Sequence, residues 1–481
     1  MTKHLDIDTK AMRDKILDLA IQGKLTDQRE EDGNARDLLK EIQAEKEKLI
    51  KEKKIKKGKP LPEIEADEIP FEIPKNWMWA RWGTLSISIK YGYNTSAQKD
   101  GKIKMVRISD IQNNQVNWDS VPFCNIPKEE ITQYLLRKND ILFARTGGTV
   151  GKSYLVSEVP ENVVYAGYLI RTRYSEKLSP QYLKYFMESD LYWSQLKKGT
   201  TTTAQPNCNA KTLGKMVLPL PPLAEQKRIA DKVATLFAQL DAIDKAYEEY
   251  RELQQAMKAK LLDLAVQGKL TDQRAEDGNA RDLLKEIQAE KEKLIKEKKI
   301  KKEKLLLEIT EEEKPFDIPE NWMWVRLGEM ILNHIGGGTP DKSNEAYWNG
   351  DIPWMSVKDV HQDSMYADRT IDSITPAGLE NSSSNLIEAN RLIVVMRMAV
   401  GRAVINKLPV AINQDLRALF FRDNVTQEYI LRIFKILKFE TSGMTVKGIK
   451  LWVLLNTPIP LPPLAEQKRI VAKLDELLPL L

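Results

Sequence analysis

The chain has 481 residues, of which 42% are hydrophobic and 30% are charged, and its formal net charge of +5 permits a nucleic-acid partner without requiring one. Its 2 cysteines and 3 histidines are widely separated, which leaves no spacing typical of a zinc site or a disulfide framework. No apolar run reaches the ~18 residues of a membrane-spanning helix, and charges occupy the N-terminus where a signal peptide is apolar, so we expect a cytoplasmic protein with no membrane segment.

An internal repeat of roughly 240 residues dominates the sequence. Residues 256–274 nearly repeat residues 11–29, and the motif Pro-Pro-Leu-Ala-Glu-Gln-Lys-Arg occurs at both 221–228 and 462–469. The central stretch 218–328 shares its first part with the C-terminus and its last part with the N-terminus. This split indicates one unit used twice and closed into a circle. A simple tandem duplication without spatial closure is the alternative.

The first half begins with helices and continues as a mixed segment. Apolar residues at helical spacing (Met12, Ile16 and Leu19) predict a helix over 10–22, and Asn34 is a suitable N-cap for a second helix that runs to about residue 55. Prolines between residues 60 and 74 predict an extended linker. β-like runs are expected at 104–108, 140–144 and 163–173, and a helix is expected at 179–197.

The second half repeats this order with different residues. Strands are expected at 352–357, 392–397 and 411–421, and a helix at 427–438. Between the halves, heptad spacing from Ile229 to Leu264 predicts a helix over 224–267, about 65 Å long at ~1.5 Å per residue. The matching seam is split between residues 470–481 and 5–19, so we expect these ends to meet as a composite antiparallel helix.

Motifs for catalysis are missing or incomplete. Residues 146–153 end like a phosphate-binding loop, but Thr146 stands where the pattern requires its first glycine, so a hairpin turn is the better interpretation. The glycine run at 336–338 is also interpreted as a turn. Neither a methyltransferase quartet nor a helicase motif is found. We therefore predict no catalytic residue, no metal site and no cofactor in this chain.

Basic, amide and hydroxyl side chains gather near the predicted β turns of both halves. Arginine recognises guanine edges, asparagine and glutamine recognise adenine, and lysine contacts phosphates, so such a set is a candidate DNA-binding surface. In the first half the candidates are Arg107, Arg145, Thr146, Lys152, Arg171, Arg173, Gln205 and Asn207. In the second half they are Thr339, Lys358, Arg397, Arg402, Gln414, Arg417 and Lys447. Any single member is also compatible with an ordinary surface residue.

The paired Pro-Pro-Leu-Ala-Glu-Gln motifs, the Gln-Gly-Lys-Leu-Thr motifs at 22–26 and 267–271, and two dissimilar intervening blocks give the chain a recognisable pattern. It resembles the specificity subunit of type I restriction–modification enzymes over essentially its whole length. The resemblance implies two target recognition domains, each reading one half of a split double-stranded DNA sequence. It also implies helices that set the spacing and hold two methyltransferase subunits, which bind S-adenosylmethionine. The resemblance further implies that translocating restriction subunits join for cleavage and that this chain itself catalyses nothing.

The predicted fold is α+β, with two mixed α/β target recognition domains separated by a long antiparallel two-helix coiled coil and related by a circular, pseudo-twofold repeat. The expected segments are N-terminal helices (1–58), a linker (59–83), the first recognition domain (84–218), central helices (219–304), a second linker (305–328), the second recognition domain (329–457) and a C-terminal helix (458–481). The chain ends without a further Gln-Gly-Lys-Leu-Thr motif, and we expect the N-terminal copy to serve instead.

Two other functions compete with this interpretation. A coiled-coil scaffold whose two globular domains bind protein is the main alternative. A self-contained restriction enzyme is disfavoured, because the chain leaves no room for nuclease and methyltransferase domains. DNA binding that is sequence-specific only together with a methyltransferase partner would separate the specificity subunit from the scaffold.

Overall fold

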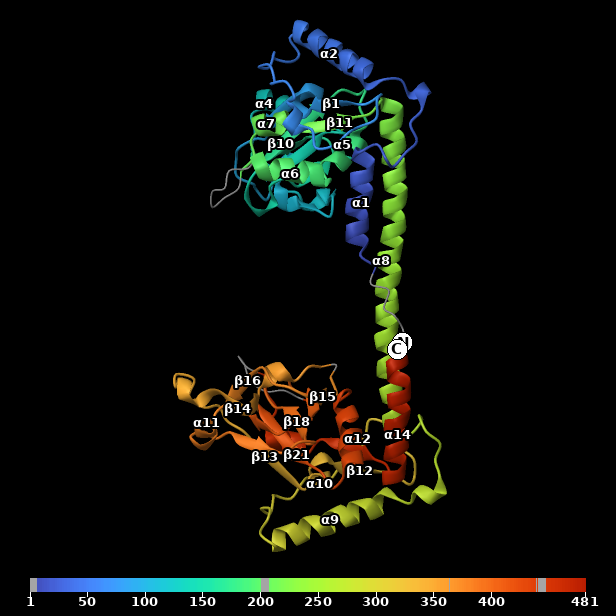
Figure 1. The fold of residues 1–481 in the computed structure, drawn as a ribbon, viewed down its shortest axis with the longest axis vertical. Helices are drawn as coiled ribbons and strands as arrows, with labels where there is room; N and C mark the ends of the chain where they lie inside the picture. Colours follow the sequence, from blue (N-terminus) through green and yellow to red (C-terminus); the bar gives the residue numbers. More distant parts are fainter. Residues whose placement is uncertain (1–6, 200–206, 363, 438, 440–446) are drawn as a thin grey trace. The chain divides into compact units, whose positions relative to one another are not determined.

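The structure is a computed structural model that describes the whole chain except residues 1–6, 200–206, 363, 438 and 440–446. The described residues form two compact units, a first within His4–Tyr247 and a second within Glu248–Leu481. Both units contain part of α8 (Leu223–Val266), a helix of 44 residues, which confirms the long central helix (Figure 1). None of the described helices combines the length and apolar character needed to cross a membrane.

Two small sheets form the core of the first recognition domain. Their strand orders are β2-β10-β7-β8 and β6-β3-β9, and β4 and β5 form a separate hairpin. The strands are β2 (Ser86–Tyr91), β3 (Ile103–Val106), β4 (Ile111–Gln112), β5 (Gln115–Val116), β6 (Phe123–Cys124), β7 (Ile141–Ala144), β8 (Ser153–Leu155), β9 (Val163–Tyr165) and β10 (Leu169–Tyr174). The helices are α3 (Trp82–Leu85), α4 (Lys128–Tyr134), α5 (Pro180–Phe186), α6 (Asp190–Gly199) and α7 (Ala210–Lys215). β1 (Met78–Arg81) pairs antiparallel with β11 (Val217–Leu220) where the chain enters and leaves this domain.

The second recognition domain repeats this topology. Its sheets have the orders β13-β21-β18-β19-β15 and β16-β14-β20-β17, so four strands of the first and three of the second follow the order seen in the first domain. The strands are β13 (Asn333–Gly336), β14 (Trp348–Met355), β15 (Tyr366–Ala367), β16 (Asp372–Ile374), β17 (Asn385–Ile387), β18 (Leu392–Val395), β19 (Ala403–Asn406), β20 (Val410–Ile412) and β21 (Leu416–Phe420). β12 (Met323–Arg326) pairs with β22 (Pro458–Leu461), as β1 pairs with β11. The predicted internal repeat is thereby confirmed in the fold.

Helices complete each unit. In the first unit these are α1 (Thr9–Ile21) and α2 (Ala35–Lys51), and the Asn34 side chain caps α2 as predicted. In the second unit they are α9 (Ala280–Lys296), α10 (Leu327–Met330), α11 (Pro376–Glu380), α12 (Asn424–Phe434), α13 (Leu451–Leu455) and α14 (Leu464–Leu477). Apolar side chains of α14 share a core cluster with those at the end of α8.

Three elements that the sequence predicts as continuous are interrupted. The strand expected at 163–173 is split into β9 and β10, and the strand expected at 411–421 is split into β20 and β21. In each case the chain turns between two strands that belong to different sheets, which a run of β-favouring residues does not reveal. The helix expected at 179–197 breaks into α5 and α6 at Ser189, whose hydroxyl donates to the Phe186 carbonyl at 2.7 Å.

α1 runs antiparallel to the N-terminal part of α8 (Figure 1), and of the apolar residues that predict this helix, Ile16 packs against the core cluster of the first unit. Leu17, Ala20 and Ile21 are its buried residues, whereas Met12 is 46% exposed. Polar contacts join the first half of α1 to α8: Arg13 donates hydrogen bonds to both Asp241 and Asp244 at 2.9 Å. The expected meeting of the first few residues with the C-terminus lies outside the described residues.

The repeated motifs of each unit bind one another. Glu225 is buried, and its carboxylate accepts hydrogen bonds from Trp77 Nε1 at 2.7 Å, Gln28 Nε2 at 2.6 Å and Thr26 Oγ1 at 3.3 Å. We call this arrangement the carboxylate clasp. The Gln-Gly-Lys-Leu-Thr motif and the Pro-Pro-Leu-Ala-Glu-Gln motif are therefore the two sides of a single structural contact.

The second unit has the same clasp. Glu466 accepts hydrogen bonds from Trp322 at 2.7 Å, Gln273 at 2.6 Å and Thr271 at 3.2 Å. An ion pair stands beside each clasp, Arg228 with Asp32 and Arg469 with Asp277, and each includes an N–O distance of 2.5 Å. The N-terminal Gln-Gly-Lys-Leu-Thr copy thus takes the place in the first unit that the internal copy takes in the second.

The clasp makes stability depend on pH. Burial raises the pKa of Glu225 above its ordinary value, while the three donors act in the opposite direction. The folded state therefore binds the proton of the Glu225 carboxyl more tightly than the unfolded chain does. The stability that comes from this difference in proton binding is complete below pH ~4.3, the unfolded pKa, and is lost as pH rises through the folded pKa. We expect the stability of the wild type relative to Glu225→Gln to fall as pH rises, measured by urea unfolding at several pH values. A relative stability that grows with pH would contradict this expectation.

Candidate nucleic-acid interface

Some of the candidate residues of each unit gather around equivalent β turns. β7 and β8 pair antiparallel with a short turn at Gly147–Thr149 between them, which confirms the hairpin interpretation of residues 146–153. β18 and β19 pair in the same way. Thr146 forms a backbone bridge with Asn207, and Arg397 forms the corresponding bridge with Gly448. Arg397 therefore occupies the position of Thr146.

In the first unit, the structure brings together Arg145, Thr146 and Asn207. The Arg145 guanidinium lies over the Tyr91 ring, 4.7 Å from its centroid. Lys152 is exposed and lines a pocket of about 480 Å³. Gln205 lies outside the described residues. A cation, a hydroxyl and an amide thus meet at one turn, which is a suitable combination for contact with phosphates and base edges.

Three other arginines of the first unit are bound within the domain. Arg171 is 1% exposed and donates to two backbone carbonyls at 2.8 and 3.2 Å, and burial lowers the pKa of its guanidinium. Arg173 donates to Asp140 at 2.8 Å, and Arg107 donates to Asp110 at 2.7 Å. Arg171 holds the sheet to the segment before it and does not face a ligand. The exposed parts of Arg107 and Arg173 are already paired with carboxylates.

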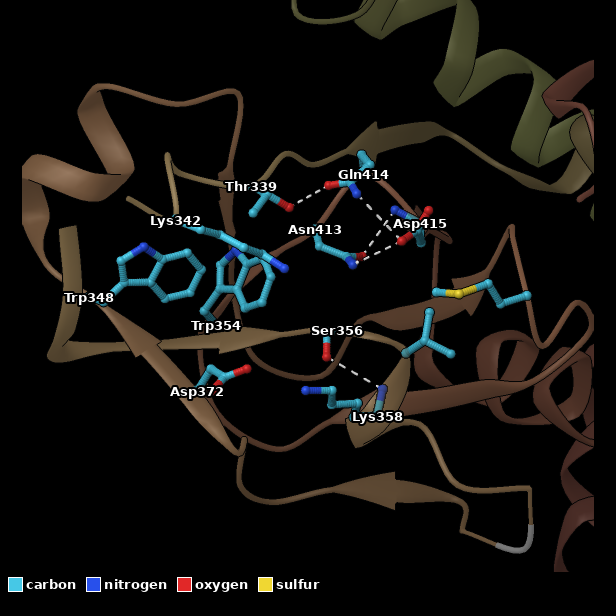
Figure 2. A pocket seen from close by; sticks show the side chains of 12 residues that line it. Thr339, Lys342, Trp348, Trp354, Ser356, Lys358, Asp372, Asn413, Gln414 and Asp415 are labelled. Carbon is cyan, nitrogen blue, oxygen red and sulfur yellow. Dashed lines mark hydrogen bonds between the residues drawn. The ribbon is translucent and has the colours of Figure 1, made fainter. Parts of the chain in front are cut away.

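In the second unit, the candidates border a pocket of about 430 Å³ (Figure 2). Trp348 and Trp354 form one wall, with their rings meeting edge to face at a centroid distance of 5.1 Å. Thr339 Oγ1 donates to Gln414 Oε1 at 2.5 Å. The exposed Lys358 lies on the rim. The pocket therefore combines aromatic surface, an amide and positive charge.

The β18–β19 turn lies next to this pocket. Arg397 Nε is 3.2 Å from Asp415 Oδ1, and half of the Arg397 side chain is exposed. The Lys447 carbonyl accepts a hydrogen bond from the backbone of the same turn at 2.9 Å, and the Arg402 amide closes the turn at 3.2 Å. Arg397, Arg402 and Lys447 are thus neighbours, although residues 440–446 just before Lys447 lie outside the described part of the chain.

Arg417 points away from this group. Its Nη1 is 2.7 Å from His334 Nδ1, and His334 Nε2 is 2.8 Å from Glu303 Oε1. The hydrogen bond from His334 lowers the pKa of Glu303, and burial lowers the pKa of Arg417. Arg417 therefore ties the sheet to the segment after α9 instead of facing the pocket.

Several polar residues at these surfaces are missed by the sequence reasoning. In the second pocket they are Lys342, Trp348 and Asn413, for which no local motif gives a signal. In the first unit, Gln112 and Asn113 line a pocket at the tip of the β4–β5 hairpin. The Asn113-Asn114 pair, with φ of 50° and 56°, is typical of a two-residue hairpin turn and is a signal that the sequence does carry.

The acidic, histidine and cysteine side chains of the described residues are dispersed. No group of three or more His, Cys, Asp or Glu side chains among these residues is arranged to hold a metal ion. The arrangement instead offers hydrogen-bond donors, acceptors and cations at exposed turns. Such surfaces bind a polyanion with readable edges, as DNA is.

Comparison with known proteins points to one family. The model of the type I restriction modification DNA specificity domain matches residues 89–250 and 319–479. The chain is 28% identical to the EcoEI specificity subunit of Escherichia coli, over 97% of this chain and 88% of that one, and 27% identical to the EcoAI specificity subunit, over 98% and 89%. A chain solved in a study of assembly and conformational transition of the type I R-M system superposes with a TM-score of 0.54, at 24% identity, over 85% of this chain and 91% of that one. The chain belongs to the family of the type I restriction modification DNA specificity domain.

Proposed function

We propose that this chain gives a type I restriction–modification complex its DNA sequence specificity, and that each recognition domain reads one half of a bipartite double-stranded target. One observation carries the proposal: the two domains share a framework but differ at equivalent surface positions. Thr146 corresponds to Arg397, and Gly167 corresponds to Gln414, because each pair follows matching strands in the two domains. Two domains with the same fold but different polar side chains at equivalent positions are suited to recognise two different DNA sequences.

The helices have a second role in this proposal. α2 and α9 have the same 17-residue sequence, ARDLLKEIQAEKEKLIK, so each unit presents the same side chains on this element. Identical surfaces suit two copies of one partner, which we take to be methyltransferase subunits that carry S-adenosylmethionine. α8 then sets the spacing between half-sites, and restriction subunits join for cleavage. This chain performs no catalytic step itself, and the complex acts on DNA in the cytoplasm.

An exchange of recognition blocks tests the proposal. Residues 77–218 are replaced with the equivalent block of a related chain, and the methylated sites of a host carrying the complex are mapped by sequencing. We expect one half of the recognised sequence to change completely while the other half and the spacer stay unchanged, because each domain has its own core clusters.

The reciprocal exchange of residues 322–456 is the matched control and should change only the other half. A change in both halves, or in neither, would contradict the assignment of one half-site to each domain. Binding of the complex to DNA without any sequence preference would instead favour a coiled-coil scaffold with protein-binding domains.

A further inference from the structure

We infer that Gln414 is an adenine-reading residue of the second recognition domain, because neighbouring side chains fix the orientation of its amide. The inference rests on the proposed function and adds the base that this position recognises. Gln414 Oε1 accepts a hydrogen bond from Thr339 Oγ1 at 2.5 Å, and Gln414 Nε2 lies 3.5 Å from Asp415 Oδ2 (Figure 2). The amide is thus held at both of its ends.

The direction of the amide follows from Asp415. This carboxylate is 5% exposed, accepts a hydrogen bond from Asn413 Nδ2 at 3.3 Å, and lies 3.2 Å from Arg397 Nε. An ionised carboxylate only accepts hydrogen bonds, so the amino end of Gln414 must face Asp415 and its carbonyl end must face Thr339. The reverse orientation would place two acceptors against each other.

The fixed amide leaves one donor and one acceptor available. An amide oxygen has two lone pairs and an amino group has two hydrogens, and the neighbours use one of each. Gln414 is exposed, so the remaining pair faces outward. In the major groove adenine offers the N6 donor beside the N7 acceptor, which complements this pair, whereas guanine offers two acceptors. Gln414 held in this orientation therefore favours binding to adenine over binding to guanine.

The glycine run before Thr339 makes this arrangement possible. A Cβ on Gly337 would lie 1.8 Å from the Ile412 carbonyl oxygen, and the Gly338 amide donates to the same carbonyl at 3.0 Å. The chain therefore passes against the end of β20, which brings Thr339 within reach of Gln414. The interpretation of residues 336–338 as a turn is therefore wrong: Gly336 ends β13, and Gly337 and Gly338 pass close to the backbone of β20.

The surroundings suit a DNA duplex. Lys342 and Lys358 are exposed beside the pocket, at positions suitable for phosphates. The half-buried Trp348, which packs edge to face on the buried Trp354, supplies an apolar surface that a thymine methyl group can contact. In the first domain Gly167 stands at the position of Gln414, so this contact is specific to the second half-site.

Base substitution combined with mutation tests the inference. The target duplex is first mapped from the methylated sites, and each adenine is replaced in turn with 7-deazaadenine, which lacks the N7 acceptor but keeps base pairing. With the complete complex of this chain and its methyltransferase subunits, we expect one adenine of the second half-site to lose about tenfold or more in affinity when replaced. In Gln414→Ala, the same replacement should cause no further loss.

One further variant tests the orientation of the amide, and a second serves as a control. Thr339→Val frees one end of the amide and should reduce the preference for adenine over guanine without abolishing binding. Gln112→Ala removes an exposed amide from the first domain and should keep the wild-type response at the second half-site. Circular dichroism verifies that each variant is folded.

The experiment distinguishes failure of this inference from failure of the proposed function. If the wild-type complex is sequence-specific but Gln414→Ala remains sensitive to 7-deazaadenine at every position, or if the second half-site has no adenine, this inference is wrong and the proposed function stands. If the wild-type complex shows no sequence preference at all, the proposed function itself fails.

Discussion

Replacing Glu225 with alanine is expected to lower the free energy of unfolding of the first unit by about 4 kcal/mol. The substitution leaves the buried Trp77 donor without its acceptor, which costs about 1–3 kcal/mol, and it removes the hydrogen bonds that the less buried Gln28 and Thr26 donate to the same carboxylate, each worth about 0.5–1.5 kcal/mol. It also removes the contact between residues 22–28 and the start of α8. Hydrogen exchange measured under native conditions should show faster exchange in α1 and β1.

The repeat supplies the matched control for this variant. Glu466→Ala breaks the same three hydrogen bonds in the second unit and should increase exchange in β12 and α14 while leaving α1 protected. Glu129→Ala removes an exposed carboxylate from the first unit and should change stability by about 0.5 kcal/mol or less. A loss below about 1 kcal/mol in Glu225→Ala would show that the clasp is not a main source of stability.

Gly337→Ala is expected to abolish recognition of the second half-site while the first half-site is still read. The added Cβ would meet the Ile412 carbonyl oxygen at 1.8 Å, and relief of this overlap must displace the backbone that carries Thr339. Overpacking of this kind costs about 1–3 kcal/mol or more, enough to move the loop without unfolding the unit. The effect is measured as binding of the complex to duplexes altered in one half-site at a time.

The equivalent glycine of the first domain gives the mirror-image control. A Cβ on Gly92 would lie 2.2 Å from the Ala166 carbonyl oxygen, so Gly92→Ala should impair the first half-site only. Gly58→Ala, which lies outside both recognition domains and whose Cβ meets nothing within 4 Å, should keep both half-sites. Equal loss of both half-sites in Gly337→Ala would mean that the substitution acts on the whole chain and not on one reader.

Repetition and periodicity predict the framework well, because they depend on patterns that extend over many residues. The long helix α8, the Asn34 cap and the repeated strand order all follow from such patterns. The turns between β9 and β10 and between β20 and β21 do not, because each depends on which sheet the next strand joins. Local propensity contains no information about that choice.

The candidate site is predicted less completely, since residue type does not reveal which way a side chain points. Arg171 and Gln414 look equally suitable in the sequence, yet Arg171 is 1% exposed and Gln414 is exposed beside a pocket. The role of Glu225 is also hidden, because its partners Trp77 and Gln28 lie 148 and 197 residues away in the chain. Contacts between residues so far apart in the sequence can be identified only from the folded structure.

The carboxylate clasp also determines when the first unit can be completed during synthesis. Gln28 emerges from the ribosome long before Glu225, which follows it by 197 residues. At ~5–20 residues per second, Gln28 waits roughly 10–40 s for Glu225, and Trp77, which precedes Glu225 by 148 residues, waits roughly 7–30 s. Closing a loop of this length costs about 5 kcal/mol in chain entropy, so the contact forms late and only with the support of a folded recognition domain. Until α5, α6 and α8 have followed, the buried side chains of α1 (Leu17, Ala20 and Ile21) remain uncovered, and a chaperone is expected to bind this nascent surface.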